Sequence, residues 1–217
     1  MLIDYIKLIL GGINMAKLYL YIGCMNSGKS LNLLANVHTY EEQGKNVLLM
    51  KPTFDSRSGL GVIDSRVGIS HNCFSFDDEE DIADIVSDYM ADLYTKGKGK
   101  IDCVFIDEAQ FMTKEQVKQV VEIVDDYGIN VICYGLKNSY VDGVIFDSMQ
   151  ELIYQANNIY EIKSSCQWCN SKATHHLRVV DGIPVRDGRQ NIVGDVKGED
   201  KYISCCRKHY YNPPKNI

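Results

Sequence analysis

The residues around position 25 combine types and a spacing that can bind a phosphate group. The chain reads G-x-x-x-x-G-K-S there. In this pattern the glycines allow a tight turn whose backbone N–H groups point at a phosphate, and the following helix directs its positive N-terminal end at the same anion. The motif predicts a nucleotide site, the P-loop, formed by Gly23, Cys24, Met25, Asn26, Ser27, Gly28, Lys29 and Ser30.

The side chains and surroundings of this motif support the same interpretation. Lys29 can reach the outer phosphates of a nucleotide, and the Ser30 hydroxyl is placed to hold a magnesium ion. The alternative is a Gly/Ser turn that joins a strand to a helix by chance. An apolar run over residues 18–22 and a helical pattern after residue 30 favour the phosphate site.

A pair of carboxylates follows a later apolar run. Residues 101–106 are mostly apolar and lead directly into Asp107 and Glu108. In P-loop proteins such a strand lies beside the P-loop strand, so its terminal carboxylates meet the magnesium ion and the γ-phosphate. An apolar run ending in Asp-Glu is common by itself, and its position downstream of a P-loop makes it more specific.

Two arginines lie in residues 51–70, a segment rich in Gly, Ser and Asp that we expect to be a long loop. Loops of this length are usually either functional or disordered. Arg57 and Arg66 could clamp phosphates from this loop. The alternative is that both are surface arginines on a mobile segment.

The C-terminal part contains two close pairs of metal-ligand residues. Cys166, Cys169, Cys206 and His209 form the pattern C-x-x-C…C-x-x-H, with Cys205 as a spectator. Four such donors can make a tetrahedral zinc site, although the insert is longer than the usual finger spacing of about 15–20 residues. Free thiols or a redox C-x-x-C are the alternatives. The pair His175 and His176 could compete as ligands, but two histidines on a strand more often mark a half-exposed surface.

The elements that position these residues alternate between short apolar strands and amphipathic helices. We expect strands at residues 18–22, 47–50, 101–106 and 130–134, and helices at 30–43, 77–94, 113–127 and 147–155. Thr113 and Gln116 can form a capping box at the start of the third helix. The alternation predicts a P-loop type of α/β fold, a parallel sheet flanked by helices.

The composition changes near residue 159. A predicted hairpin at 179–185 and a polar loop at 187–201 lie between the two metal-ligand pairs, where the loop could cover a substrate. We therefore expect a dispensable extension at 1–14, an α/β domain at 15–158, and a small zinc-ribbon domain with a substrate-covering loop at 159–217. Met15 resembles a second start site.

Composition and charge limit the classes of partner. The chain has 217 residues and a net charge of −6, whereas nucleic-acid binding normally requires a basic surface. No segment approaches the ~18 apolar residues of a membrane span. Because no secretory signal is evident, we expect a cytoplasmic protein with reduced thiols.

Taken together, these features resemble the thymidine kinase family that includes the cytosolic animal enzyme and most bacterial ones. The resemblance extends over residues 15–210. It rests on the P-loop, on the segments Phe105-Ile106-Asp107-Glu108-Ala109-Gln110-Phe111, Asp55-Ser56-Arg57, Ser65-Arg66-Val67-Gly68 and Cys133-Tyr134-Gly135-Leu136, and on the C-terminal run from Tyr202 to Tyr210.

The resemblance implies transfer of the ATP γ-phosphoryl group to the 5′-hydroxyl of deoxythymidine. It places the general base at Glu108, magnesium at Ser30 and Asp107, and a phosphate contact at Arg57. Ala109 and Gln110 would complete the ATP site beside the P-loop. The nucleoside pocket would contain Met25, Phe111, Leu136, Tyr140 and Tyr202.

The resemblance also implies a homotetramer, feedback inhibition by dTTP, and a zinc-anchored loop that grips the base. Two departures concern that grip. Lys197-Gly198 stands where the family often has Gly-Gly, and a lysine adopts positive φ less readily. Tyr140 stands where phenylalanine is usual, and its hydroxyl could change the choice among nucleosides.

Two other functions remain open from the sequence. The first is a P-loop module without kinase activity whose zinc ribbon binds nucleic acid or a protein. The net charge of −6 and the lack of a basic, aromatic-interleaved run near the cysteines oppose nucleic-acid binding. The second is a kinase for another deoxynucleoside, such as deoxyuridine or deoxycytidine.

Overall fold

A six-stranded parallel sheet forms the centre of the protein. The computed structural model describes residues 16–55, 59–190 and 200–215. The strand order is β5-β2-β6-β7-β1-β8, and every neighbouring pair is parallel. The sheet consists of β1 (Leu18–Gly23), β2 (Val47–Pro52), β5 (Phe74–Phe76), β6 (Cys103–Ile106), β7 (Asn130–Leu136) and β8 (Asn158–Ile162). The predicted fold class is therefore confirmed.

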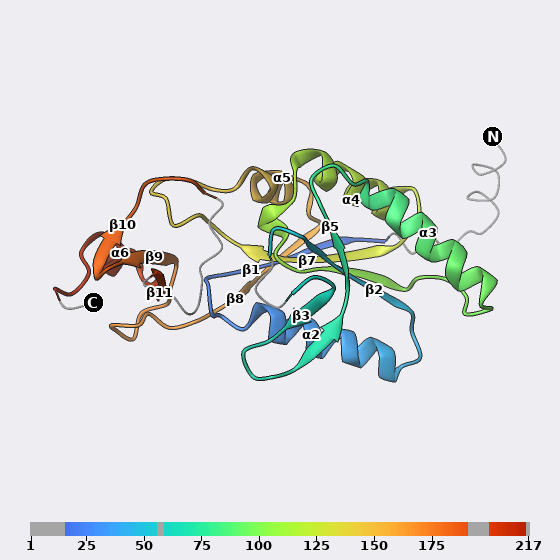
Figure 1. Ribbon diagram of the computed structural model, residues 1–217, viewed down its shortest axis with the longest axis horizontal. Coiled ribbons are helices and arrows are strands. Elements are labelled where there is room, and N and C mark those ends of the chain that lie inside the picture. The colour runs from blue at the N-terminus through green and yellow to red at the C-terminus, as the bar shows by residue number, and fades with distance from the viewer. Residues whose placement is uncertain (1–15, 56–58, 191–199, 216–217) are drawn as a thin grey trace.

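Helices cover both faces of this sheet (Figure 1). Helix α2 (Lys29–Glu42) packs on one face, and α3 (Ile82–Thr95), α4 (Lys114–Asp125) and α5 (Asp147–Gln155) pack on the other. The continuous apolar run in β2 follows from this arrangement, because successive strand side chains point to opposite faces. Leu48 and Met50 join the core beneath α3–α5, whereas Leu49 joins the core beneath α2.

Local sequence signals set the ends of two helices on that face. The predicted capping box of α4 is present: Gln116 N–H donates to Thr113 Oγ1 at 3.1 Å, and Thr113 N–H donates to Gln116 Oε1 at 3.0 Å. Helix α3 begins at Ile82 rather than near residue 77, because the Asp81 side chain caps it by accepting from the N–H groups of Ala83 and Asp84.

Part of the segment predicted as a loop at 51–70 forms regular structure. It contains β3 (Val62–Asp64), which pairs in antiparallel fashion with β4 (Ser70–Asn72). The side chain of buried Lys51 contacts the chain just before this hairpin: its Nζ donates to the Gly59 carbonyl at 3.0 Å. The expectation of a continuous loop is therefore wrong for this part of the chain. The hairpin is too short and too polar to show a clear alternating pattern.

A second, smaller sheet lies at one end of the molecule, next to the last helix, α6 (Arg207–Tyr211) (Figure 1). It has the order β10-β9-β11, formed by β9 (His175–Val180), β10 (Ile183–Val185) and β11 (Asp200–Cys205). The predicted hairpin is β9–β10, whose turn has positive φ at Asp181 and Gly182, as a two-residue turn of type I′ requires.

The last strand of the six-stranded sheet along the chain is β8. Strand β8 pairs with β1 as far as Ile162, so the six-stranded sheet continues past residue 158. The described residues contain no helix long and apolar enough to cross a membrane. The predicted extension at 1–14 lies outside the described residues.

Candidate active site

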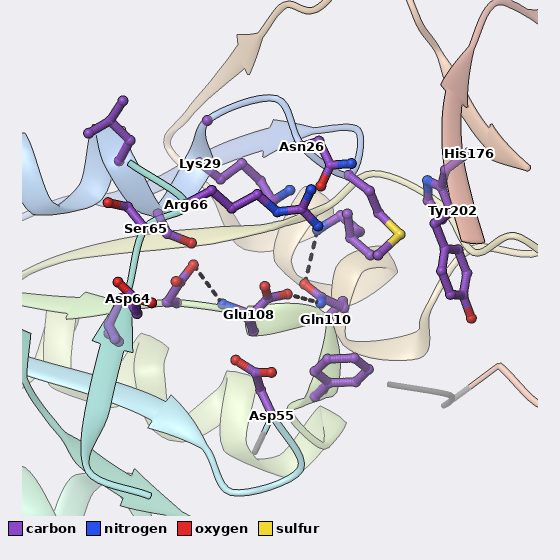
Figure 2. A pocket seen from close by; sticks show the side chains of 18 of the residues that line it. Asn26, Lys29, Asp55, Asp64, Ser65, Arg66, Glu108, Gln110, His176 and Tyr202 are labelled. Carbon is purple, nitrogen blue, oxygen red and sulfur yellow. Dashed lines mark hydrogen bonds between the residues drawn. The ribbon is translucent and has the colours of Figure 1, made fainter. Parts of the chain in front are cut away.

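A cavity of about 380 Å³ opens where β1, β6 and β7 end at their carboxyl edges, the usual ligand position in an open parallel sheet. Its walls come from the P-loop, the β3–β4 hairpin, the segment after β6, and the small C-terminal sheet. Figure 2 shows Lys29, Arg66 and Glu108 near its middle, with His176 and Tyr202 together on one side.

The P-loop has the conformation that its sequence predicts. Asn26 and Gly28 have positive φ values of 60° and 85°, and Lys29 Nζ donates to the Cys24 carbonyl at 2.9 Å. Gly23 permits a close approach, since a Cβ there would lie 2.4 Å from Ser27 Oγ. No side chain caps the start of α2, so its first N–H groups are available to an anion.

The carboxylates after β6 are buried and held in place. Glu108 is 8% exposed and has φ 51°, a strained value for a residue other than glycine. Gln110 Nε2 donates to Glu108 Oε2, while Gln110 Oε1 accepts from the Leu136 N–H at 3.0 Å. The Gln110 amide is therefore fixed from both sides and sets the orientation of Glu108.

Asp107, the residue before Glu108, is also buried. The Glu108 N–H donates to Asp107 Oδ1 at 3.0 Å. Burial, together with the nearby charge of Glu108, raises the pKa of Asp107 well above its ordinary value, and the hydrogen bond with Ser30 opposes that rise. A divalent cation bound here would favour the ionised form. The pair Ser30 and Asp107 thus has the oxygen donors that Mg²⁺ prefers.

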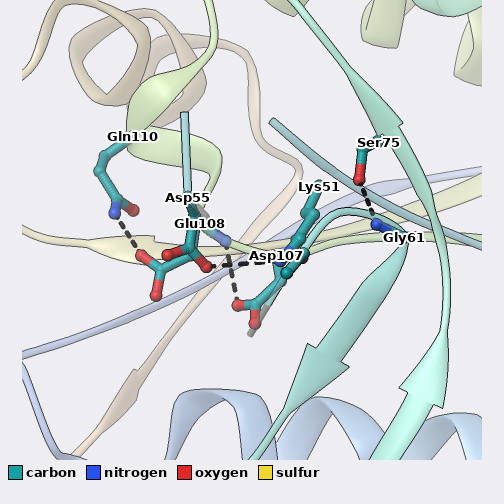
Figure 3. A network of polar contacts seen from close by, with 8 residues as sticks. Lys51, Asp55, Gly61, Ser75, Asp107, Glu108 and Gln110 are labelled. Carbon is teal, nitrogen blue, oxygen red and sulfur yellow. Dashed lines mark hydrogen bonds and ion pairs between the residues drawn. The ribbon is translucent and has the colours of Figure 1, made fainter. Parts of the chain in front are cut away.

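An ion pair at the end of β2 lies near these carboxylates (Figure 3), and its Asp55 lines the same cavity. Asp55 is buried and lies 3.9 Å from Lys51 Nζ through its Oδ2. The ion pair fixes the start of the segment that leads to the β3–β4 hairpin. The predicted phosphate contact Arg57 lies outside the described residues.

All five residues of the predicted nucleoside pocket line the cavity: Met25, Phe111, Leu136, Tyr140 and Tyr202. Phe111 is stacked at an angle on Phe54, with ring centroids 4.7 Å apart. The hydroxyl of Tyr140, which departs from the family pattern, donates to the Arg189 carbonyl at 2.8 Å. It therefore anchors the C-terminal part of the chain. Lys197 and Gly198 lie outside the described residues.

Most residues of the predicted ATP site line the cavity, and four do not. The cavity wall includes Met25, Asn26, Gly28, Lys29, Ser30, Asp107, Glu108 and Gln110. Ala109 and Cys24 are buried, whereas Gly23 and Ser27 shape the turn of the P-loop. These four support the site through packing and backbone geometry.

Two further residues belong to the cavity wall: Arg66, which the sequence offered as a phosphate clamp, and His176, which was not assigned a role in this cavity. Arg66 projects into the cavity from the turn of the β3–β4 hairpin. His176 was expected on a half-exposed surface but is 2% exposed and belongs to the cavity wall. A signal for His176 exists in the alternation of residues 176–179: apolar Leu177 and Val179 share one face of the strand, which places His176 with Arg178 on the other face.

The four predicted metal-ligand residues come together in the C-terminal region. The donor atoms of Cys166, Cys169, Cys206 and His209 lie within 4.8 Å of one another. Cys169 Sγ lies 3.9 Å from Cys206 Sγ, and Cys166 Sγ lies 3.3 Å from His209 Nδ1. A tetrahedral zinc site with Zn–S bonds of about 2.3 Å requires sulfur–sulfur separations of roughly 3.8 Å, so the donor set fits zinc.

Neighbouring cysteine and histidine residues are not part of this cluster. Cys205 is fully buried and packs with Leu177 and Tyr210, as a spectator should. His175 stacks on Tyr210 with ring centroids 4.8 Å apart. Neither His175 nor His176 belongs to the group of donors.

The fold and the site together define a P-loop nucleotide-binding protein with a carboxylate pair at the phosphate end of its cavity. A sequence model of the family described as thymidine kinase matches residues 16–210. The chain therefore belongs to the thymidine kinase family, and it is a kinase.

Individual relatives agree with this assignment. The chain is 41% identical to the thymidine kinase of Lactococcus lactis subsp. lactis over 92% of its length and 99% of that protein. It is 41% identical to the thymidine kinase of Streptococcus thermophilus, over 93% of this chain and 96% of the relative. A solved structure of Pif1 helicase from Candida albicans aligns with a TM-score of 0.39 and 14% identity, over 75% of this chain and 39% of that one. That likeness is too low to support an inference.

Proposed function

We propose that this kinase transfers the γ-phosphoryl group of ATP to the 5′-hydroxyl of deoxythymidine, giving ADP and dTMP. One observation carries the proposal. Glu108, buried and strained, stands in a single cavity between the P-loop Lys29 and an apolar wall that includes Phe111 and Tyr140. This arrangement separates a phosphate end from a nucleoside end, with a carboxylate between them.

The phosphate end accounts for binding and charge neutralisation. The P-loop N–H groups and Lys29 would hold the ATP phosphates. Ser30 and Asp107 would hold Mg²⁺, which neutralises the charge of the phosphates when bound. Phosphoryl transfer depends mainly on positioning and electrostatic stabilisation, so these groups are the ones the reaction needs.

Glu108 would act on the acceptor. Its carboxylate is placed to accept a hydrogen bond from the 5′-hydroxyl and to take that proton as the new O–P bond forms. In a loose transition state the hydroxyl proton is lost late, so Glu108 would orient the hydroxyl as well as deprotonate it. Gln110 is a positioning residue, since it holds Glu108 Oε2.

The coupled ADP-release assay tests this function directly. With ATP, Mg²⁺ and each of the four deoxynucleosides or deoxyuridine, we expect release with thymidine and deoxyuridine only. The Lys29→Ala variant should abolish release. ATP binding without release for any nucleoside would overturn the proposal and favour a binding module with another partner.

Arg66 is expected to contribute to phosphate binding, although it is exposed at the hairpin turn. A hydrogen bond to a charged group contributes about 1.5–3 kcal/mol. We therefore expect Arg66→Ala to lower kcat/KM by about ten- to a hundredfold, and Arg66→Lys to lower it less. Lys118→Ala, on the distant helix α4, is the control. Equal kcat/KM for Arg66→Ala and the unchanged protein would make Arg66 a surface residue without this role.

Several further proposals rest on the family resemblance. We propose a zinc-containing cytoplasmic homotetramer that is inhibited by dTTP and does not use nucleic acid as a partner. Light scattering, metal analysis, a dTTP titration of the kinase assay and an oligonucleotide-retention assay at moderate salt measure these properties separately.

A further inference from the structure

One face of the small C-terminal sheet is polar and forms part of the cavity wall. In the register of β9 and β11, His176 lies opposite Ser204 and Arg178 lies opposite Tyr202. Directly opposed residues of antiparallel strands share a face, so these four side chains are on the same side. The other side carries Leu177, Val179, Ile203 and Cys205, which belong to the apolar cluster around Tyr210.

This polar face is joined to the P-loop domain. Ser204 Oγ donates to the Met25 carbonyl at 2.5 Å, which ties β11 to the P-loop. Arg178 donates through NH2 to Asp200 Oδ2 at 2.6 Å and through NH1 to the Tyr140 hydroxyl at 3.4 Å. Ser204 and Arg178 therefore have structural partners.

His176 has a different environment. The residue is 2% exposed and lines the cavity, and its ring centroid lies 6.5 Å from that of Tyr202. Its Nδ1 has no hydrogen-bond partner among the described residues. A buried polar group without a partner destabilises a fold, so an imidazole at this position calls for a ligand that uses it.

The protonation state limits what His176 can do. Burial, followed by the charge of Lys29, lowers the pKa of His176 to about 3. The ring is therefore neutral at physiological pH, with one N–H donor and one acceptor nitrogen, and it is too weak a base to replace Glu108. It also lies outside the metal cluster. A neutral hydrogen bond to a ligand is the remaining chemistry.

The position in the cavity indicates which part of a ligand this is. The acceptor hydroxyl must reach Glu108, and the phosphates must reach Lys29, which leaves the base of the nucleoside for the wall beside Tyr202 and Tyr140. Figure 2 shows His176 on that wall, across the cavity from Asp64 and Ser65. Thymine offers two carbonyl oxygens and one N–H group along its edge.

We propose that His176 hydrogen-bonds a carbonyl oxygen of the pyrimidine base and is a specificity-determining residue of this kinase. The inference rests on the proposed function and deepens it. It assigns the base-recognising hydrogen bond to a side chain of β9, in addition to any contact from the loop that follows β10.

The first test is the His176→Leu variant. We expect the KM for thymidine to rise about five- to a hundredfold, with the KM for ATP unchanged. His175→Leu is the matched control, because His175 stacks on Tyr210 and does not line the cavity. His176→Gln, which keeps a neutral donor, should recover part of the affinity.

Stability separates this role from a structural one. Leucine removes an unpartnered polar group at a buried position, so His176→Leu should have a Tm equal to or above that of the unchanged protein. A higher KM accompanied by a clear fall in Tm would indicate that His176 supports the fold, and would overturn the inference.

Altered bases test the contact from the ligand side. Sulfur accepts hydrogen bonds less well than oxygen. We therefore expect the unchanged protein to have a higher KM for either 2-thiothymidine or 4-thiothymidine than for thymidine. The ratio of these two KM values, analogue over thymidine, should fall towards one in His176→Leu. Identical ratios in both proteins would overturn the inference, whereas no turnover of thymidine by the unchanged protein would overturn the proposed function itself.

Discussion

Replacing Glu108 with glutamine is expected to lower kcat by about 10²–10⁴-fold, the usual contribution of a positioned general base. Glutamine keeps the size of the side chain and can still accept the hydrogen bond from Gln110, so the variant should fold. The KM for ATP should stay near its original value. The coupled ADP-release assay with saturating thymidine measures the change.

Magnesium dependence provides an internal check on this variant. The charge of Glu108 raises the pKa of Asp107, so its removal should make Asp107 easier to ionise and should not weaken magnesium binding. Glu115→Gln, an exposed change on α4, is the control for effects of charge alone. An unchanged kcat in Glu108→Gln would remove Glu108 from the mechanism.

Loss of metal from the Cys-Cys-Cys-His cluster should strongly destabilise the C-terminal region. We expect about one zinc ion per chain, because the four donors complete a closed tetrahedral site. Zinc binding by such sites provides about 10–16 kcal/mol of apparent folding free energy. Chelation, or the change Cys206→Ser, should therefore unfold the C-terminal region, which can be followed by proteolysis and by a lower Tm.

The expected effect on activity is selective. The cluster joins Cys166 and Cys169, which precede β9, to Cys206 and His209, which follow β11, so its loss releases the wall that carries His176 and Tyr202. Thymidine turnover should fall severely, while ATP binding at the P-loop persists. Cys205→Ala should keep its zinc. Freshly reduced protein without zinc would refute the assignment of the metal.

Much of the site follows from short-range sequence patterns. The P-loop spacing fixes a turn whose positive φ values occur at Asn26 and Gly28, and the acidic pair follows a buried strand. The Thr113–Gln116 capping box is equally local. Because parallel strands end at one edge of a sheet, these patterns were enough to predict that Lys29, Asp107 and Glu108 share a cavity.

The sequence by itself thus determined the α/β fold, the family and the four possible metal-ligand residues that the structure brings together. Tertiary structure decided how the small C-terminal sheet completes the cavity wall. The burial of His176 and the bond from the Tyr140 hydroxyl to the Arg189 carbonyl both depend on segments far apart in the chain. The contact of Ser204 with Met25 is the clearest example, since no local pattern encodes which surface one sheet will present to another.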